Sequence, residues 1–425
     1  MEAYAQVLNY AVPFFVTLII IEQIIAYKQG KKINRGPDVI ASLSSGNTNA
    51  IKDVLQLSIA IVSYGWLVSK VALFEIEASW LLFVIAFVAK DFAGYWMHRW
   101  EHEINFLWNR HIIHHSSEEF NLSCALRQSI SEIFSIFAVL MLPAALLGVP
   151  VEVIAVVGPL HLFAQFWYHT KVIDKMGIFE KFIVTPSHHR VHHAMNDEYL
   201  DKNFGQVFII WDKMFGTFQV ELPNVTPVYG IKKPAKTWNP ILINWQHFWI
   251  LAQDAWRTKS WKDKFLLWFK PTGYRPADVK EKYPINIVND MSTFEKYDTH
   301  LSNRLLGWSW FQMIVTFVLM FHMFNNIAEI GMPDMFFYGT FLIVCIFSYT
   351  TLMDKTKQAF TAELIKIIFG LALIYWQGND WFGLAAISPV WIYLLVGYFF
   401  FSLIAVYYFL KTEIDIEVKK VGSIA

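Results

Sequence analysis

Long apolar runs separated by polar stretches are the main pattern along this chain. Runs close to the ~20 residues that a bilayer-spanning helix needs predict membrane helices. They lie at roughly 9–27, 54–74, 79–97, 133–149, 151–169, 306–328, 336–353, 359–376 and 385–410. The fourth and fifth runs meet at Gly148-Val149-Pro150 and predict a tight helical hairpin, either spanning or re-entrant. The pattern therefore predicts about nine membrane segments.

Composition supports this interpretation. The 425 residues are 55% hydrophobic, 17% aromatic and 16% charged, which is too apolar for a soluble domain of this length. The formal net charge is zero, which argues against a nucleic-acid partner. With Cys124 and Cys345 alone, neither a disulfide framework nor a cysteine-based zinc site is available. We therefore expect an all-α fold, a polytopic membrane helical bundle.

The distribution of basic residues predicts how the segments are oriented. Lysine and arginine follow the first and seventh segments and fill the C-terminal tail: Lys28, Lys31, Lys32, Arg35, Lys52, Lys355, Lys357, Lys411, Lys419 and Lys420. The opposite loops are acidic, with Glu75, Glu77, Glu152, Glu329, Asp334 and Asp380. Basic loops stay on the cytoplasmic side, so nine alternating segments from an outside N-terminus also place 98–132 and 170–305 there.

Histidines are concentrated in one part of the chain, where 11 of the 14 fall between His98 and His193. They form three boxes, one H-x-x-x-H and two H-x-x-H-H: His98 and His102; His111, His114 and His115; His189, His192 and His193. On a helix these spacings keep the imidazoles within an arc of about 100°. All three boxes fall on the predicted cytoplasmic face, which indicates a metal site there.

The remaining histidines are expected to differ in role. His169 ends the fifth apolar segment and is expected to cap the site from the membrane side. His161, eight residues earlier, lies near the same helix face but not on it, so it is a possible ligand or supporting residue. His188 is expected to support a ligand, because His189 completes the box spacing. The isolated His247, His300 and His322 are expected to be ordinary surface or packing residues.

The number of histidines indicates two metal ions. All-imidazole ligation suits iron, zinc, copper or nickel, and eight to ten ligands exceed the four of one tetrahedral zinc. The zinc-protease motif H-E-x-x-H is absent, since His102-Glu103 is followed by Ile-Asn-Phe. A pair of irons that activates O2 beside a lipid is the natural use of such a site.

The boxes and their flanking residues resemble a known group of enzymes. Their order and spacing resemble the fatty acid hydroxylase and sterol desaturase superfamily, and longer motifs resemble its alkylglycerol monooxygenase family. These motifs are His98-Arg-Trp-Glu-His-Glu103, His115-Ser-Ser-Glu-Glu-Phe-Asn-Leu-Ser-Cys-Ala-Leu-Arg127, Gln165-Phe-Trp-Tyr-His-Thr170, Thr185-Pro-Ser-His-His-Arg-Val-His-His193, Asp201-Lys-Asn-Phe-Gly205, Trp211-Asp-Lys-Met-Phe-Gly-Thr-Phe218, Val228-Tyr-Gly230 and Leu352-Met-Asp-Lys355. The resemblance covers nearly the whole chain.

The resemblance implies an activity and its cofactors. The family hydroxylates the carbon next to an ether oxygen, so the lipid falls apart to an aldehyde and a glycerol derivative. Two Fe ions, O2 and tetrahydrobiopterin as reductant are implied. The implied metal ligands are the eight box histidines, His98, His102, His111, His114, His115, His189, His192 and His193, with His169 as a further one. Glu103 matches an acidic residue after the first box and is expected to assist catalysis by orienting a ligand.

The chain is expected to divide into four parts. Residues 1–97 hold the N-terminal membrane segments, 98–220 the catalytic core, 221–305 a proline- and tryptophan-rich segment, and 306–425 four C-terminal membrane segments. In 221–305 the later tryptophans alternate with basic residues, which predicts a helix in the headgroup plane; the alternative is a soluble linker around the core. Nothing in the sequence resembles a fused cytochrome b5, so a small molecule or a separate protein is expected to donate electrons.

Two other functions remain open from the sequence. The first is a fatty acyl or sterol hydroxylase or desaturase of the same superfamily, because the boxes fix the chemistry rather than the lipid. The second is a metal transporter that uses the histidines as a relay. A transporter calls for polar residues along several spans, whereas these histidines gather at one face.

Overall fold

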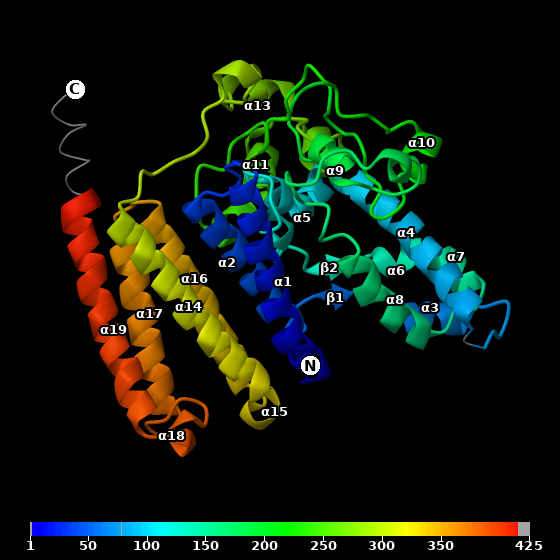
Figure 1. The fold of residues 1–425 in the computed structure, drawn as a ribbon. Coiled ribbons are helices and arrows are strands. Elements are labelled where there is room, and N and C mark those ends of the chain that lie inside the picture. Colours follow the sequence, from blue (N-terminus) through cyan, green and yellow to red (C-terminus); the bar gives the residue numbers. More distant parts are fainter. Residues whose placement is uncertain (1, 78, 415–425) are drawn as a thin grey trace.

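The computed structural model describes residues 2–77 and 79–414, and these residues are almost entirely helical (Figure 1). Within them the only strands are β1 (Ile59–Ala60) and β2 (Phe134–Ser135), a short parallel pair. The all-α fold is therefore confirmed. Residues 415–425 of the predicted C-terminal region, including Lys419 and Lys420, lie outside the described residues.

Among the described residues, six helices are long and apolar enough to cross a membrane. They are α1 (Glu2–Lys28), α4 (Trp80–Glu103), α14 (Asn303–Asn325), α16 (Asp334–Met353), α17 (Gln358–Trp376) and α19 (Val390–Phe409). Serine side chains fix where two of them begin, because Ser79 accepts a hydrogen bond from Leu82 N and Ser302 from Leu305 N. Six of the predicted apolar segments thus form the expected helices, and the chain is an integral membrane protein.

The other three predicted segments do not form helices long enough to span, so the prediction of about nine spans is not confirmed for the described residues. Residues 54–74 divide between the end of α2 (Gly36–Val54), β1 and the short helix α3 (Tyr64–Val71). Residues 133–149 form β2, α6 (Phe137–Leu140) and α7 (Leu142–Leu146), and α8 (Val151–Phe163) has 13 residues. These short pieces pack against α4, and Ile59 pairs with Phe134.

The ends of the long helices lie at two opposite ends of the molecule (Figure 1). Although they do not span, α3 and α7 lie beside the lower end of α4 in Figure 1 and carry the chain to that end and back. The end of α1, the end of α4, the start of α14 and the end of α16 all lie at the opposite, upper end (Figure 1). Lys28 and Lys355 therefore lie at the same end of the molecule as the histidine boxes, although the side of the membrane remains a prediction.

The four C-terminal spans form one bundle that packs onto α2. Gly339 in α16 permits this contact, since a Cβ there would lie 2.5 Å from Leu55 Cδ1. Inside the bundle the buried pair Glu363 and Lys366 is 2.6 Å apart, and Lys366 also donates to Ser402. Both charges are thus satisfied away from lipid.

The upper end carries the remaining helices around the boxes. These are α5 (Asn105–His115), η1 (Cys124–Leu126), η2 (Gly177–Lys181), α9 (Pro186–His192), α10 (Ile210–Phe215), α11 (Pro240–Arg257), α12 (Trp261–Leu266), η3 (Leu267–Phe269), α13 (Ala277–Lys282) and η4 (Met291–Thr293). The short α15 (Ile327–Ile330) and α18 (Leu384–Ile387) close turns at the lower end, and α19 continues as the π-helical η5 (Leu410–Ile414). Helix α11 packs along α5 and covers the boxes.

Candidate metal centre

Four parts of the chain bring the histidines together. His98 and His102 lie in the last turns of α4, and α5 with the second box folds back against α4 after the extended residue Ile104. The third box lies on α9, with His193 as its C-terminal cap. His169 comes from the loop after α8. Sequence spacing placed each box on one helix face, and helix packing points these faces at one another.

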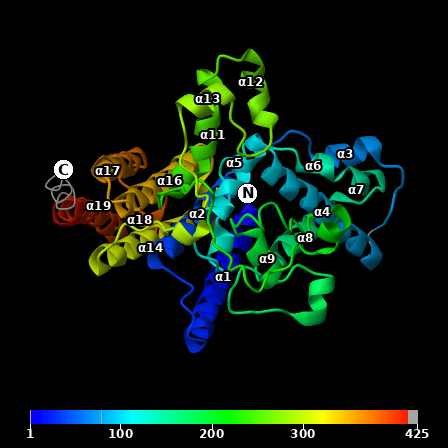
Figure 2. The same ribbon diagram turned by 90° about the horizontal axis from the view of Figure 1, so that it is seen from above.

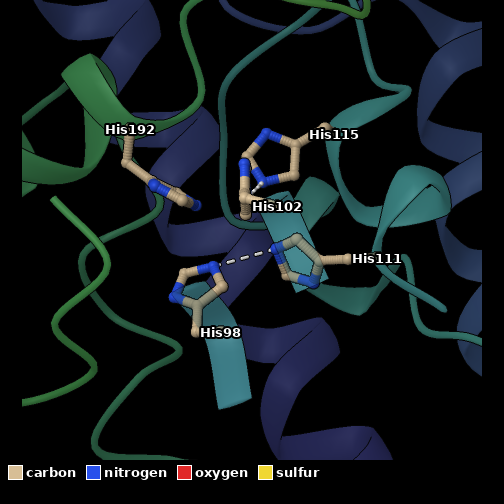
Figure 3. A group of neighbouring side chains, drawn as sticks. All are labelled: His98, His102, His111, His115 and His192. Carbon is tan, nitrogen blue, oxygen red and sulfur yellow. Dashed lines mark hydrogen bonds between the residues drawn. The ribbon is translucent and has the colours of Figure 1, made fainter. Parts of the chain in front are cut away.

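The nine histidines form two groups, each with ligating nitrogens within 4.8 Å of one another. Group A contains His98, His102, His111, His115 and His192 (Figure 3). Group B contains His114, His169, His189 and His193. The groups adjoin, because the His115 and His193 rings stack with centroids 4.3 Å apart.

The second and third boxes each contribute to both groups. His111 and His115, four residues apart, enter group A, whereas His114 enters group B. On α9 the arrangement is reversed, since His189 and His193 enter group B and His192 enters group A. Successive residues of a helix point about 100° apart, so the adjacent histidines His114 and His115 can point into different groups. Helices α5 and α9 therefore lie between the two groups. Each helix contributes most of its histidines to one group and a single histidine to the other.

Nitrogen atoms meet at distances typical of ligands that share an ion. Nε2 of His98 lies 2.9 Å from Nε2 of His111, and Nε2 of His169 lies 2.8 Å from that of His189. A neutral imidazole has one N–H, so a cluster of ring nitrogens cannot satisfy all its members by mutual hydrogen bonds. Among the described residues, His192 Nε2 and His189 Nδ1 are buried without any partner. Buried polar atoms normally have partners, so nitrogen lone pairs without a hydrogen-bond donor are suited to binding metal cations.

Backbone carbonyls orient several of these rings. Nδ1 lies near Phe204 O for His98 (2.8 Å), Lys202 O for His192 (2.9 Å) and Gln165 O for His169 (3.0 Å). A carbonyl only accepts, so each Nδ1 carries the proton and each Nε2 offers its lone pair to the cluster. The fold thus sets the tautomer that metal binding needs.

The electrostatics keep these histidines neutral. Burial, followed by repulsion from His98, lowers the pKa of His114 to about 3. Burial also lowers the pKa of His189, His192 and His193 well below the usual value, again with neighbouring imidazoles contributing. At neutral pH these rings are therefore unprotonated and able to bind metal.

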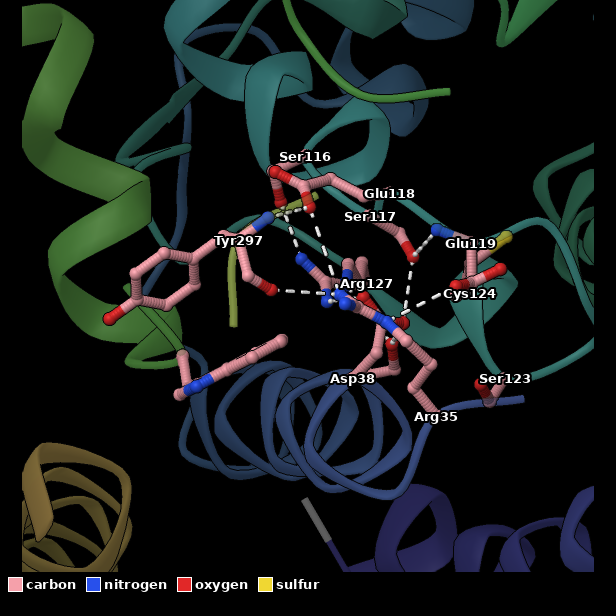
Figure 4. A network of polar contacts seen from close by, with 12 residues as sticks. Arg35, Asp38, Ser116, Ser117, Glu118, Glu119, Ser123, Cys124, Arg127 and Tyr297 are labelled. Carbon is pink, nitrogen blue, oxygen red and sulfur yellow. Dashed lines mark hydrogen bonds and ion pairs between the residues drawn. The ribbon is translucent and has the colours of Figure 1, made fainter. Parts of the chain in front are cut away.

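A buried polar network holds the segment after the second box (Figure 4). Arg127 donates to Asp38 Oδ2 at 3.0 Å, to Ser42 Oγ at 3.0 Å and to Ser116 Oγ at 2.8 Å. The backbone carbonyl of Arg127 accepts from His114 Nδ1 at 3.3 Å. Asp38, on α2, is a positioning residue that the sequence did not single out, because its partner lies 89 residues away.

A second carboxylate holds the loop behind His98. Asp212 accepts hydrogen bonds from the backbone N–H groups of Phe204 and Gly205, both at 2.7 Å, and from the Thr217 hydroxyl. The Phe204 carbonyl in turn orients His98. Asp212 lies in the Trp211–Phe218 motif, so the motif was the available signal for it.

Three predicted site residues lie outside both groups. His161 is bonded to Asp91, with Nε2 2.7 Å from Oδ1, and this carboxylate also accepts from Val207 N and Trp211 Nε1. His188 meets the backbone N–H of Thr185 at the start of α9. The prediction of His161 as a ligand is therefore not supported, and both residues have structural partners instead.

Glu103 also lies away from the imidazoles. It forms a partly buried ion pair with Arg99 at 2.8 Å, one helical turn earlier. Two other carboxylates approach ring nitrogens instead: Glu101 lies 3.5 Å from His111 Nδ1, and Asp201 lies 3.5 Å from His102 Nδ1. In the structure the carboxylates beside ring nitrogens are therefore those of Glu101 and Asp201, whereas Glu103 pairs with Arg99.

A cavity of about 340 Å³ opens onto both groups. Its floor includes His102, His115, His192 and His193. Its walls are largely aliphatic, with Ile112, Ile231, Ile250, Leu251, Ile285 and Ile287, and its polar side chains include Asn105, Lys232, Lys233, Gln246 and Arg275. A substrate with an apolar chain and a polar end would fit between these walls. The predicted 221–305 segment thus supplies one side of the site.

Comparison with known proteins agrees with this geometry. Residues 83–217 match the family model described as fatty acid hydroxylase. The chain is 33% identical over 366 residues to the alkylglycerol monooxygenase of Homo sapiens, covering 85% of this chain and 81% of that protein. It is 30% identical over 365 residues to the alkylglycerol monooxygenase of Xenopus tropicalis, covering 85% and 81%. The ornithine lipid hydroxylase of Rhizobium tropici is 28% identical over 184 residues, covering 43% and 53%.

No solved structure matches the chain. The likeness to the two alkylglycerol monooxygenases extends far beyond the matched core of 83–217, as the motifs predicted. It favours an oxidoreductase over the metal transporter that the sequence left open. The chain therefore belongs to the alkylglycerol monooxygenase family, oxidoreductases of the fatty acid hydroxylase superfamily that act on membrane lipids.

Proposed function

We propose that the two histidine groups each hold one iron and that the enzyme hydroxylates the carbon next to the ether oxygen of an alkylglycerol lipid. The observation that carries this proposal is the arrangement of nine imidazoles in two adjoining groups beside one cavity. Imidazole is a good ligand for iron, and five and four ligands leave positions open for oxygen. Two bound irons would supply the reduction of O2 and the insertion of one oxygen atom into a C–H bond.

The chain itself would bind and shield the reacting carbon. Ile112, Ile250 and Leu251 exclude water around the alkyl chain next to the floor. Lys233 and Gln246, which also line the cavity, would contact the polar glycerol end of the lipid. The hydroxylated carbon would carry both an ether and a hydroxyl oxygen, and collapse of this hemiacetal gives a fatty aldehyde and a glycerol derivative.

Hydroxylation needs two electrons and two protons besides the substrate, because the second oxygen atom leaves as water. We propose tetrahydrobiopterin as the donor, on the family resemblance, with a separate redox protein as the alternative. Helices α1 and α16 end at the same end of the molecule as α5 and α9 (Figure 1), Lys28 is the last residue of α1, and Lys355 follows α16. These basic residues support an active site on the cytoplasmic face. Either donor would reach it there.

A fatty acyl or sterol hydroxylase is the second candidate. The likeness to an ornithine lipid hydroxylase supports it, although that likeness extends over only 43% of this chain. The two candidates make different products: ether cleavage releases an aldehyde, whereas acyl or sterol hydroxylation leaves the carbon skeleton intact.

Metal analysis and turnover on one detergent-purified sample test the proposal. We expect about two irons per chain by inductively coupled plasma mass spectrometry. Hexadecylglycerol with tetrahydrobiopterin should then release hexadecanal, and omission of the pterin should stop release. Two irons without aldehyde would move the search to acyl or sterol substrates. Zinc alone from an iron-replete preparation would contradict the di-iron centre. His300→Ala, at an exposed surface position, is the matched control.

A further inference from the structure

Large aromatic side chains are exposed on α11, α12 and η3, outside the six spanning helices. We define the aromatic surface as Leu242, Trp249, Trp256, Trp261, Phe265 and Phe269. Trp256 is 86% exposed and Trp261 73% exposed. Tyr375 on the spanning helix α17 is 82% exposed, which the surrounding lipid explains. The aromatic surface shows the same exposure and needs an explanation of its own.

The aromatic surface and the cavity lie on different sides of α11. Leu242, Trp249 and Trp256 are seven residues apart, so they form one stripe along the helix. The other side of α11 is buried or lines the cavity, as His247 and Leu251 do. One helix thus separates the reaction cavity from an exposed apolar stripe. Figure 2 shows α11, α12 and α13 projecting to one side of the molecule.

The charges around the aromatic surface are suited to phospholipid headgroups. Five basic residues and two acidic residues lie between 240 and 270. Both acidic side chains have internal partners, since Asp254 pairs with Arg275 at 2.6 Å and Asp263 accepts from the Tyr274 hydroxyl. Lys259 and Lys262 are exposed beside Trp261. Aromatic side chains interleaved with outward lysines are typical of a helix at the boundary between headgroups and acyl chains.

We propose that the aromatic surface lies in the membrane leaflet beside the cavity and docks the α11–α12 projection on lipid. A lipid leaflet is the occupant that combines apolar chains with anionic headgroups and is already in contact with the neighbouring spans. Lipid at this surface would be separated from the histidine centre only by α11. The proposal concerns position in the membrane and holds whichever lipid the enzyme hydroxylates.

Fluorescent labels at introduced cysteines test the position directly. The two native cysteines, Cys124 and Cys345, are buried, so a bimane label at Trp256→Cys or Phe265→Cys is selective. The full-length protein is placed in nanodiscs of phosphatidylcholine and phosphatidylglycerol, with or without brominated acyl chains. Iodide in the buffer reports exposure to water. Ile368→Cys on α17 serves as the lipid control, and Lys280→Cys on α13 serves as the water control.

We expect labels at 256 and 265 to lose at least half of their fluorescence to brominated lipid, as the label at 368 does, and to resist iodide. Quenching by iodide, as at 280, would mean that the surface faces water and would overturn the proposal. Protection from both quenchers would mean that protein covers the surface, for example a second copy of the chain, and would overturn it as well. Normal iron content of each labelled protein confirms that the variant is folded.

Discussion

Nε2 of His169 lies 2.8 Å from Nε2 of His189, although one comes from the loop after α8 and the other from α9. The backbone carbonyl of Gln165 accepts a hydrogen bond from Nδ1 of His169, which keeps the proton on Nδ1 and leaves Nε2 as the free lone pair. His169 is thus the member of group B that lies outside the three boxes, and it supplies the fourth nitrogen.

Replacing His169 by alanine should therefore remove group B's metal and leave group A's. We expect iron to fall from about two to about one per chain by mass spectrometry, with loss of turnover. His161→Ala is the matched control, because His161 pairs with Asp91 and belongs to neither group. Full iron content in His169→Ala, or loss of one iron in His161→Ala, would contradict the assignment.

Single replacements of His192 and His193 test whether adjacent histidines of α9 bind different metal ions. His192 joins group A while its neighbour His193 joins group B. We therefore expect His192→Ala and His193→Ala to deplete different ions, and the double variant to lose both. Mössbauer spectra of protein grown on ⁵⁷Fe should show a different remaining iron site in each single variant. Identical spectra would indicate that the ions do not occupy separate groups.

Arg127→Gln should destabilise the protein strongly. The change leaves the buried carboxylate of Asp38 without its charge partner, which typically costs about 3–5 kcal/mol of the free energy of unfolding. A lower midpoint of thermal unfolding in detergent is the expected result. Arg304→Gln, at an exposed position on α14, provides the comparison. An unchanged midpoint would show that the network in Figure 4 does not hold the second box.

Acid should destabilise the metal-free protein over a defined range. Burial keeps the folded-state pKa of His114 at about 3, below its unfolded value of 6.5. Below pH 6.5 the unfolded chain gains protons that the folded chain does not, so stability present above pH 6.5 is lost as the pH falls toward 3. Each such histidine contributes up to about 1.4 kcal/mol per pH unit.

The check is thermal unfolding of chelator-treated protein between pH 8 and pH 5. The midpoint should be steady in the upper part of this range and fall in the lower part. Protein reloaded with iron should resist acid better, because bound metal competes with protons for the same nitrogens. A metal-free midpoint that does not change with pH would contradict the burial of neutral imidazoles.

Asp354→Ala should loosen the contact between the C-terminal bundle and the catalytic core. Asp354 follows α16 and accepts from Trp238 N at 2.7 Å, from the Tyr297 hydroxyl at 3.1 Å and from Thr237. Leaving these buried donors unpaired costs about 1–3 kcal/mol each. We expect faster proteolysis within 221–305, measured against Asp334→Ala at the far end of the same helix. Equal rates would contradict the linking role.

The sequence by itself determined the chemistry of the centre and the helical class. Six of the nine long apolar runs form the helices α1, α4, α14, α16, α17 and α19, as expected where the backbone must satisfy its own hydrogen bonds in lipid. The H-x-x-x-H and H-x-x-H-H spacings place each box on one helix face for purely local reasons. The histidine boxes and their flanking motifs were also enough to predict the resemblance to the alkylglycerol monooxygenase family.

Only the tertiary structure decided how the nine histidines divide. Whether His114 joins His115 or His189 depends on the packing of α5 against α9, which no local spacing encodes. The same holds for Glu103 and Glu101, whose roles differ by the rotation of α4 against α5. The apolar run at 54–74 does not span because its backbone finds a partner strand 75 residues away, at Phe134, instead of satisfying itself within one helix.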